Sequence, residues 1–429
     1  MSTDAYEWAI PFSFTIYCNK ENPGNNSSIV NKLWYYFPMK IVRSLIICTL
    51  ITTIFLSLLM VSCTAKYVYE TPGQTDDGWE TASLNEVRLN ESKLSELISH
   101  VNQGQYENIH SILIIKDEKL VFEKYFPGYR FDYFGDQFQG EYIEFDINTI
   151  HNLASVTKAF TAALIGIAID KGFIQDMEER VFTFFPEYSY LNDESKDKIT
   201  IEHLLTMTSG LDWNEGDIPL TDTERNDLIR LFYVPDPIEY ILSKSVITEP
   251  GTHFYYSGGD VNLLGEIIGR ATGLRIDDFA EKYLFSPLGI SNYEWKFLND
   301  NIVYTSGDLA MRPRDMAKLG QLYLNNGIWN HKQIISEDWI KSSTSKYVPV
   351  ANDYMSKAYG DRYGYQWFLQ KFDVDSTSID SVSRDGWGGQ RIQVFPSINT
   401  VVVFTGGNYA TEPTPVNDII TRFILPAVR

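Results

Sequence analysis

Ser155 and Lys158 lie three residues apart in a stretch of the chain that is almost free of charge. Between Asp146 and Asp170, Lys158 carries the one formal charge. The run 154–169 is otherwise apolar or small, and it predicts a buried helix. Residues i and i+3 of a helix share a face, so the serine hydroxyl and the lysine amine should be neighbours. A dehydrated lysine loses its proton more readily and can then accept the proton of an attacking serine.

A structural role for the pair is the alternative interpretation. In that case Ser155 caps the helix N-terminus and Lys158 extends its ammonium to solvent from the first turn. The same Ser-x-x-Lys spacing recurs twice among polar residues, where it predicts solvated surface: Ser195/Lys198 and Ser343/Lys346. Only the first pair has an apolar setting, and this setting favours a catalytic role.

Two further segments carry groups that a serine nucleophile needs. Tyr256 lies in the turn 250–259, before a helix-patterned run at 261–272. Beside a lysine ammonium its phenol would ionise more readily and could act as a general base. The segment 385–390, Asp-Gly-Trp-Gly-Gly-Gln, opens a strand, and its glycines let backbone N–H groups approach a developing oxyanion. Taken alone, a turn into an edge strand would explain this last segment better.

In this order the three segments resemble those of the serine β-lactamase and penicillin-binding-protein superfamily, on its class C side. The likeness is greater to the branch of β-lactamase-related hydrolases that includes 6-aminohexanoate-oligomer hydrolases and carboxylesterases. It runs from about residue 108 to 425, and two further phrases support it, Ile199–Leu211 and Ser306–Ala317.

The resemblance implies a role for each matched residue. Ser155 would be the nucleophile, Lys158 its activating partner, and Tyr256 the third member, which relays a proton to the leaving group. The backbone N–H groups of Ser155 and Gln390 would bind the oxyanion. The dipole at a helix N-terminus would also favour that negative charge.

Two departures from the family pattern bear on the substrate. Gly258 stands where the family often has asparagine, so an amide that helps to hold substrate is missing. Trp387 stands where the lactamases carry a basic residue that pairs with the carboxylate of penicillin-like substrates. An indole cannot make that pair, although it can line an apolar pocket. We therefore expect small, less anionic ester, amide or peptide-like substrates, and these substrate-binding residues: Trp387, Gly388, Gly389 and Gln390.

The sequence leaves three functions open. The first is an exported, membrane-anchored serine hydrolase that acts through an acyl-enzyme on small esters or amides. The second is a D-Ala-D-Ala carboxypeptidase or β-lactamase. The third, from another class, is a catalytically silent lipoprotein that binds cell-wall material or peptides in the same cleft. The presence of Ser155, Lys158 and Tyr256 together argues against the third.

Hairpin-patterned segments near both ends of the body indicate how these residues are positioned. Apolar runs flank short polar turns at 111–126 and again at 390–404. The middle, from about 155 to 345, is mostly helix-patterned. Together these segments predict an α+β fold, in which strands from both ends form one antiparallel sheet flanked by helices, with an inserted, mainly helical lobe.

The front of the chain carries an export pattern. Residues 45–62 are free of charge, follow Lys40 and Arg43, and end at Cys63. The segment 59–63 resembles a bacterial lipoprotein box, in which the cysteine is lipidated. An uncleaved membrane anchor is the alternative. Either pattern predicts a membrane-anchored protein of the cell envelope with its catalytic body outside the cytoplasm.

We therefore expect four parts along the chain. Residues 1–38 fit poorly before such a signal, and we hypothesise that they form a mis-annotated leader. Residues 39–63 would be the signal or anchor, 64–105 a tether and a first helix, and 106–429 the hydrolase domain. The cysteines lie at or before position 63, so the body should have neither disulfides nor a cysteine metal site: Cys18, Cys48 and Cys63.

The charge balance and the histidines exclude other classes of site. Asp and Glu number 56 against 36 Lys and Arg, a net charge of −20, which repels phosphate backbones and disfavours nucleic acid as a partner. The six histidines show no metal-ligand spacing, and His151 and His203 are predicted to be hydrogen-bonded structural residues. We expect neither a metal nor a cofactor.

Overall fold

The computed structural model describes residues 67–428, apart from 217, 346, 351, 375 and 411–413. The predicted leader 1–38 and the predicted signal or anchor 39–63, with Cys63, lie outside the described residues. Within the described part, no helix is both long and apolar enough to span a bilayer.

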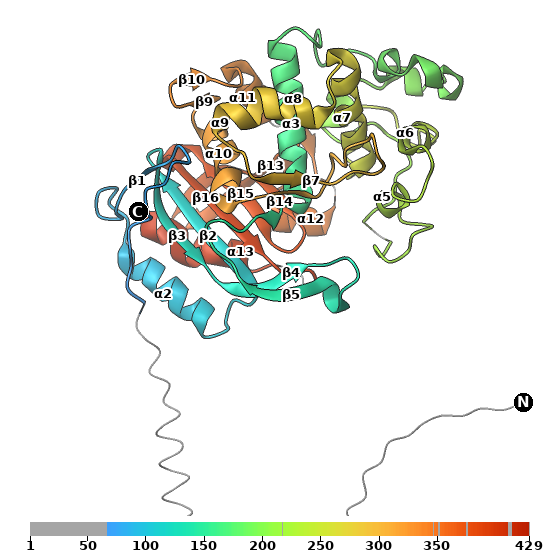
Figure 1. Ribbon diagram of the computed structural model, residues 1–429. Coiled ribbons are helices and arrows are strands. Elements are labelled where there is room, and N and C mark those ends of the chain that lie inside the picture. The colour runs from blue at the N-terminus through green and yellow to red at the C-terminus, as the bar shows by residue number, and fades with distance from the viewer. Residues whose placement is uncertain are drawn as a thin grey trace, which may run out of the picture. The chain divides into compact units, whose positions relative to one another are not determined.

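A nine-stranded sheet forms the centre of the fold, in the order β1-β3-β2-β16-β15-β14-β13-β12-β11 (Figure 1). Strand β2 pairs antiparallel with β16, so the sheet joins strands from both ends of the described chain, as predicted. Only the short edge strand β1 runs parallel to its neighbour among the described strands of this sheet. The strands are β1 (Glu80–Thr81), β2 (Ile109–Lys116), β3 (Lys119–Tyr125), β11 (Val348–Pro349), β12 (Arg362–Tyr363), β13 (Phe368–Val374), β14 (Thr377–Gly386), β15 (Gln390–Phe395) and β16 (Thr400–Gly406).

Both predicted hairpins are present. Asp117 and Glu118, both with positive φ, link β2 to β3 in a two-residue turn whose twist matches that of the strands. Strands β15 and β16 are linked through a 3₁₀ turn (Pro396–Ile398) and Asn399, which adopts a left-handed φ of 45°. The two hairpins lie side by side because β2 pairs with β16.

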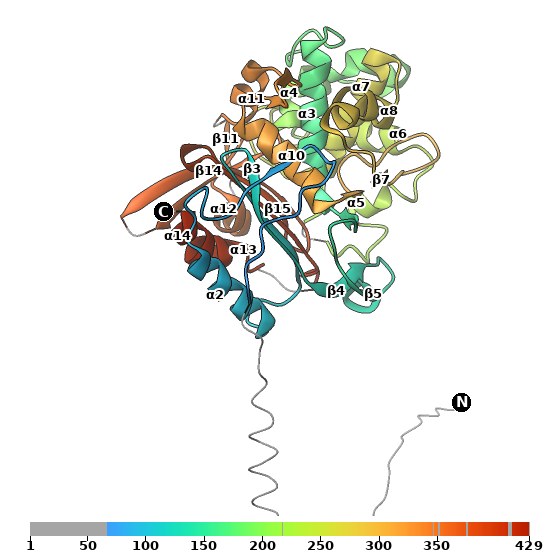
Figure 2. The ribbon, with the colours of Figure 1, turned by 60° about the vertical axis from the view of Figure 1, so that its left-hand side comes forward.

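Helices cover both faces of the sheet, which explains why its strands are apolar on both sides. On β2, Leu113 and Ile115 belong to one core, and Ile112 and Ile114 belong to the other. The first core lies against α3 (Thr157–Asp170) and α10 (Pro313–Leu324), and the second against α2 (Glu91–Asn102), α13 (Val416–Ile419) and α14 (Leu425–Val428) (Figure 2).

The predicted helical lobe is inserted between β3 and β12, with the short strand β11 within this stretch, and it surrounds α3 (Figure 1). Because α3 packs against the sheet and against α7, it is buried all round, which its unbroken apolar sequence requires. The other helices of the lobe are α4 (Ile201–Leu205), α5 (Asp227–Arg230), α6 (Pro237–Leu242), α7 (Gly258–Thr272), α8 (Ile276–Ala280), α9 (Ser286–Leu288), α11 (Glu337–Ser343) and α12 (Asp353–Tyr359).

Three small sheets complete the fold. A three-stranded sheet, in the order β6-β8-β7, pairs the residues just before Ser155 with the middle of the chain. The hairpin β4–β5 lies near the segment between β14 and β15. The rings of Phe131 and Phe138 from the hairpin contact the ring of Trp387 in that segment. The strands are β4 (Pro127–Phe131), β5 (Gln139–Glu144), β6 (His151–Asn152), β7 (Tyr293–Trp295), β8 (Leu309–Met311), β9 (Ile328–Trp329) and β10 (Lys332–Gln333).

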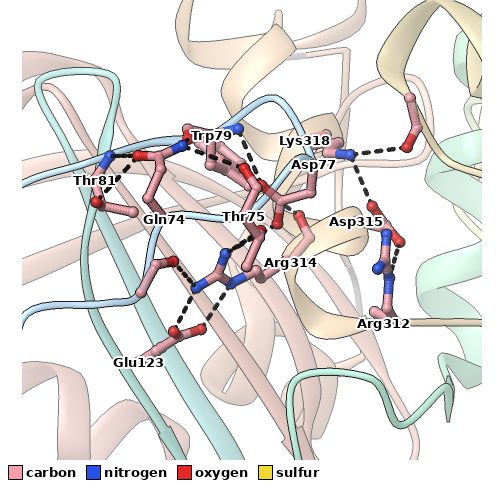
Figure 3. A network of polar contacts seen from close by, with 12 residues as sticks. Gln74, Thr75, Asp77, Trp79, Thr81, Glu123, Arg312, Arg314, Asp315 and Lys318 are labelled. Atoms are coloured by element: carbon pink, nitrogen blue, oxygen red, sulfur yellow. Dashed lines mark hydrogen bonds and ion pairs between the residues drawn. The ribbon is translucent and has the colours of Figure 1, made fainter.

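Residues 67–90, predicted to continue the tether, instead pack on the body, and we call them the strap. Trp79 is 2% exposed, and its indole Nε1 donates to the carbonyl of Arg314 at 3.0 Å. Arg314, 1% exposed at the start of α10, donates to Asp77 and Thr75 of the strap and to Glu123 of β3 (Figure 3). The Pro-Gly and Asp-rich composition suggested a linker, but Trp79 and Asp77 have partners that only the folded body supplies. The predicted start of the tether at residue 64 lies outside the described residues. The first helix, predicted at 92–103, is present as α2.

Candidate active site

The predicted contact between Ser155 and Lys158 is present. Ser155 lies in a 3₁₀ turn, η3 (Ala154–Val156), that leads directly into α3. The Lys158 amine donates to Ser155 Oγ at 2.9 Å and to the carbonyl of Ser306 at 2.6 Å. Lys158 is 1% exposed, whereas Ser155 is partly exposed. The amine is therefore dehydrated, as predicted, while the hydroxyl stays within reach of a ligand.

The backbone just before Ser155 is strained. Ala154 has φ of +45°, a left-handed conformation that a residue with a Cβ seldom adopts. The side chain of Asn152 holds this turn, because its Oδ1 accepts from Ala154 N at 2.7 Å and its Nδ2 donates to Asp308 at 2.9 Å. Strained backbone that neighbours hold in place is characteristic of functional sites.

Tyr256 lies beside the Lys158 amine, two residues before the start of α7. It directly precedes Ser257, the N-cap of α7, and the Lys158 amine lies 5.0 Å from the centre of its ring. Burial alone would raise the pKa of Tyr256, but the positive charges of Arg384 and Lys158 outweigh it and lower this pKa below its ordinary value. The Ser155 side chain also helps to lower the pKa of the Tyr256 phenol.

Arg384, which sequence reasoning missed, completes this cluster from β14. Its side chain is fully buried and donates to the Tyr256 hydroxyl at 2.7 Å and to the main-chain carbonyl of Ser155 at 2.8 Å. Its remaining contacts are with Tyr363 and Gln366. The signal in the sequence was an arginine inside a strand just before the glycine motif.

The glycine motif lies in the turn between β14 and β15. Gly388 and Gly389 have φ of +88° and +93°, which only glycine adopts readily. At the end of β14, a Cβ on Gly386 would lie 3.2 Å from Ser155 N and 3.1 Å from Gln390 Cβ. The backbones of Ser155 and Gln390 therefore approach each other here, as the predicted pair of oxyanion donors requires.

The side chain of Gln390 faces away from this point. Its Nε2 donates to the carbonyl of Gly406 at 2.8 Å, and its Oε1 accepts from Gly406 N at 3.0 Å. These two hydrogen bonds to β16 hold the start of β15 in place. It leaves the main chain of Gln390 as the part that can serve the site.

Trp387 joins an aromatic cluster beside the motif. Its ring centre lies 4.7 Å from that of Phe138, 5.7 Å from Phe131 and 5.2 Å from Tyr409. Phe131 ends β4, so the β4–β5 hairpin supplies one side of this cluster. The aromatic surroundings agree with the prediction that Trp387 belongs to an apolar surface.

Glu215 and Leu228 together fill the space of the side chain that is missing at Gly258, where a Cβ would lie 2.5 Å from Leu228 Cδ1. Its Oε2 accepts from Gly258 N at 2.7 Å and from the indole Nε1 of Trp213 at 2.6 Å. A Cβ on Gly258 would lie only 2.8 Å from that oxygen. Burial raises the pKa of Glu215 above its ordinary value, although the charge of Lys158 opposes this shift. Sequence reasoning missed this residue because 43 positions separate it from Gly258.

The remaining sequence predictions have mixed outcomes. Ser195 is exposed, as predicted, but Ser343 is fully buried at the end of α11 and donates to the carbonyl of Ile340, so predicting a surface position for it was wrong. The surrounding polar residues misled that prediction, because α11 turns Ser343 inward.

His203 forms a capping box with Thr200, a structural role. His151 bonds to His110 and to its neighbour's carbonyl, also a structural role. In the described part of the chain, no group of three or more His, Cys, Asp or Glu could hold a metal.

Comparisons with known proteins show the family and the fold of this chain. The family model described as Beta-lactamase matches residues 108–419. The 6-aminohexanoate-dimer hydrolase of Paenarthrobacter ureafaciens is 24% identical over 59% of this chain and 65% of its own length. A putative D-alanyl-D-alanine carboxypeptidase of Escherichia coli K12 is 28% identical over 56% of this chain and 54% of its own. The match thus spans less than two thirds of these relatives. A putative 6-aminohexanoate-dimer hydrolase from Bacillus anthracis shares the fold, with a TM-score of 0.62, 20% identity, and coverage of 85% of this chain and 91% of that one.

Proposed function

The chain belongs to the beta-lactamase family, whose fold is that of serine hydrolases, and we propose that it hydrolyses small ester or amide substrates through an acyl-enzyme on Ser155. The observation that carries the proposal is the Lys158 amine 2.9 Å from Ser155 Oγ, with the Tyr256 ring facing both. A buried amine, a partly exposed hydroxyl and a phenol of lowered pKa form the kind of unit that activates a serine.

In the acylation step, Tyr256 as phenolate takes the proton of the Ser155 hydroxyl. The Lys158 amine donates to Ser155 Oγ and to the Ser306 carbonyl, so it orients the nucleophile and balances the negative charge that forms. Ser155 Oγ then bonds to the substrate carbonyl carbon. The oxyanion forms beside the N–H groups of Ser155 and Gln390. As the tetrahedral intermediate collapses, the bond to the alcohol or amine breaks, and Tyr256 returns its proton to the leaving group.

Deacylation repeats these steps with water. Tyr256 takes a proton from a water molecule, whose oxygen attacks the acyl carbon. The bond from this carbon to Ser155 Oγ then breaks, the acid leaves, and Ser155 regains its proton from Tyr256. The net reaction consumes one water and restores the enzyme.

The surroundings of the site support a substrate of low negative charge. Trp387 stands at the position where a basic residue would pair with a substrate carboxylate, and aromatic rings surround it. Arg384 and Arg391 flank the motif, and both direct their donors to protein oxygens. The name of the Paenarthrobacter relative describes hydrolysis of a small dimer, which fits the same size class.

A second candidate is D-Ala-D-Ala carboxypeptidase or β-lactamase activity. The likeness to the putative carboxypeptidase of Escherichia coli favours it. It predicts a stable covalent adduct with labelled penicillin, and the absence of an adduct at high penicillin concentration would exclude it. A silent binding protein would show neither that adduct nor turnover.

A fluorophosphonate probe tests the nucleophile. We expect the wild-type protein to be labelled and Ser155→Ala to be unlabelled, with loss of p-nitrophenyl ester hydrolysis by roughly 10³-fold or more. The matched control is Ser195→Ala, because Ser195 has the same spacing to a lysine but lies exposed. Equal labelling of the Ser155→Ala protein would disprove the assignment. Lys158→Met should lose activity to a similar extent, because the members of such a unit act together.

We also propose that the enzyme is exported and held at the cell envelope through lipidated Cys63. The support is the basic, apolar and cysteine-ended pattern of residues 40–63. Metabolic labelling with a palmitate analogue should mark the wild-type protein and not Cys63→Ala. If peptides from before Met39 are found by mass spectrometry of the mature protein, both the start at Met39 and cleavage at Cys63 are excluded.

A further inference from the structure

We infer that Arg384 is a positioning residue that holds Tyr256 as the proton acceptor of the reaction and ties it to the nucleophile's backbone. This inference rests on the proposed function, because it assigns a role within the same reaction. It follows from the contacts of one buried guanidinium.

The first support is the way Arg384 bridges the two reacting residues. Its Nη2 donates to the hydroxyl oxygen of Tyr256 at 2.7 Å, and its Nε donates to the carbonyl of Ser155 at 2.8 Å. A guanidinium is planar and rigid, so one group fixes both distances at once. The phenol oxygen is thereby held next to the serine whose proton it must take.

The second support is that Arg384 is completely buried and no carboxylate is hydrogen-bonded to it among the described residues, although the charge of Asp385 also acts on it. Nη1 donates to the hydroxyl of Tyr363 at 2.5 Å and to the carbonyl of Gln366 at 3.2 Å, both neutral groups. Asp385, the adjacent carboxylate, bonds instead to Arg391 and Ser383. A buried guanidinium without a bonded carboxylate favours a negative charge on a neighbouring oxygen, and Tyr256 supplies that oxygen.

The other charged and titratable groups around Tyr256 come from four elements. Lys158 of α3 adds a second positive charge, and Glu215, from the segment after α4, opposes both cations. Tyr363 of β12 and Tyr304, before β8, are buried phenols whose pKa values burial raises, so they stay neutral. Among these groups, Tyr256 is the phenol with positive charges on two sides.

A hydrogen bond donated to its oxygen stabilises the phenolate but also makes it a weaker base. Two cations therefore set a balance, in which Tyr256 is ionised at lower pH and still accepts a proton from a serine that is itself becoming an oxyanion. Without Arg384, the phenol would hold its proton to higher pH, and activity would need more alkaline conditions.

The test compares pH profiles of kcat/KM for a neutral p-nitrophenyl ester. In Arg384→Met, we expect the ascending limb to move upward by roughly 1–3 pH units, with activity at neutral pH lower by about 100-fold and partly recovered at alkaline pH. Arg384→Lys should fall between this variant and the wild type. The matched control is Arg391→Met, because Arg391 is equally buried on the next strand but bonds to Asp385 and Asn417. The control should lose thermal stability without moving the limb.

A spectroscopic titration covers the case in which Arg384→Met fails to fold. The ultraviolet absorbance of tyrosinate, taken as wild type minus Tyr256→Phe, isolates one phenol among 27 tyrosines. We expect this difference to titrate below the ordinary range of tyrosine and to move upward in Arg384→Lys. The inference would be overturned if the ascending limb of the kcat/KM profile stayed in place in a folded Arg384 variant. It would also be overturned if the limb moved equally in Arg391→Met, or if Tyr256 titrated in the ordinary range of tyrosine.

These outcomes are distinct from failure of the proposed function. If the wild-type protein is not labelled by the fluorophosphonate probe, or if Ser155→Ala keeps the ester activity, then the proposed function fails. If labelling depends on Ser155 but the profile ignores Arg384, the hydrolase assignment stands and only the role of Arg384 is rejected.

Discussion

This site differs from the family pattern at Gly258. Glycine replaces the asparagine that the family often has, and Glu215, a residue distant in the sequence, lies beside it. Gly258 lacks the amide that the resemblance would supply, and the Glu215 carboxylate occupies the space beside it. The site therefore presents a carboxyl group, with a raised pKa, in place of a neutral amide. This difference changes the chemical group that lies beside Gly258, near the proposed nucleophile.

A double-mutant cycle at these two positions tests the exchange. Gly258→Asn alone should destabilise the protein by roughly 1–3 kcal/mol, because its Cβ would lie 2.5 Å from Leu228 Cδ1 and 2.8 Å from Glu215 Oε2, of which Glu215→Ala removes only the second contact. Glu215→Ala alone should leave Gly258 N and the Trp213 indole without their acceptor. The double variant should be more stable than the sum of the single effects predicts. Strict additivity in urea unfolding would show that the two side chains do not compete for one space.

At the scale of elements, two buried histidines link the central sheet to the segment that leads into Ser155. His110 of β2 and His151 of β6 bond ring to ring at 2.9 Å. His151 also contacts the carbonyl of Asn152, whose side chain holds the strained turn before Ser155. Burial lowers the pKa of His110 to about 2 and that of His151 to about 4, with the charge of the other histidine as a second cause for His110.

The histidine pair predicts loss of stability in mild acid. Above about pH 6.5 both rings are neutral in the folded and the unfolded chain, so they cost nothing. As the pH falls below that value, both histidines are protonated in the unfolded chain but stay neutral in the folded chain. At about pH 5 each ring should lower the free energy of unfolding by roughly 2 kcal/mol. For His151 the loss should level off near its folded pKa, about 4.

Urea unfolding at about pH 7 and about pH 5 measures this effect. In His110→Phe the loss between the two values should shrink by roughly 2 kcal/mol, since one of the two buried histidines is gone. His253→Gln is the control, because His253 is exposed. If His110→Phe loses as much stability in acid as the wild type, the buried pair does not cause the sensitivity.

At the scale of the whole molecule, the strap joins the front of the described chain to its helical and sheet layers. Arg314 holds Asp77 at 3.0 Å and Thr75 at 2.9 Å on the strap, and both oxygens of Glu123 on β3 (Figure 3). The Arg314 guanidinium keeps the pKa of Asp77 below its ordinary value, although burial opposes this. One arginine thus ties three segments that are far apart in the sequence.

Removing this arginine should release the strap. Arg314→Met leaves two carboxylates without their partner and should destabilise the protein by roughly 3–5 kcal/mol. Arg422→Met serves as the control, because Arg422 pairs with Asp418 at the surface and should cost less than about 1 kcal/mol. Thermal unfolding and limited proteolysis near residue 80 report on both variants. A strap that stays protected in Arg314→Met would show that its other contacts hold it, among them the Trp79 indole and the pairing of β1 with β3.

Sequence alone determined the helix that carries Ser155 and Lys158, the two hairpins and the general fold. These features depend on spacing and apolar patterning within short segments, so local physics decides them. The same reasoning identified Tyr256 and the glycine motif, each from its own segment together with the resemblance.

Only the tertiary structure decided which charged side chains, distant in the sequence, lie beside Tyr256 and Gly258. Arg384 reaches Tyr256 across 128 positions and Glu215 reaches Gly258 across 43, and neither contact leaves a periodic trace in the chain. The strap differs from its prediction for the same reason, since Asp77 and Trp79 find their partner 237 and 235 positions away, at Arg314. A charge is stabilised in the interior by whatever opposite group folding brings to it, and that group can come from any part of the chain.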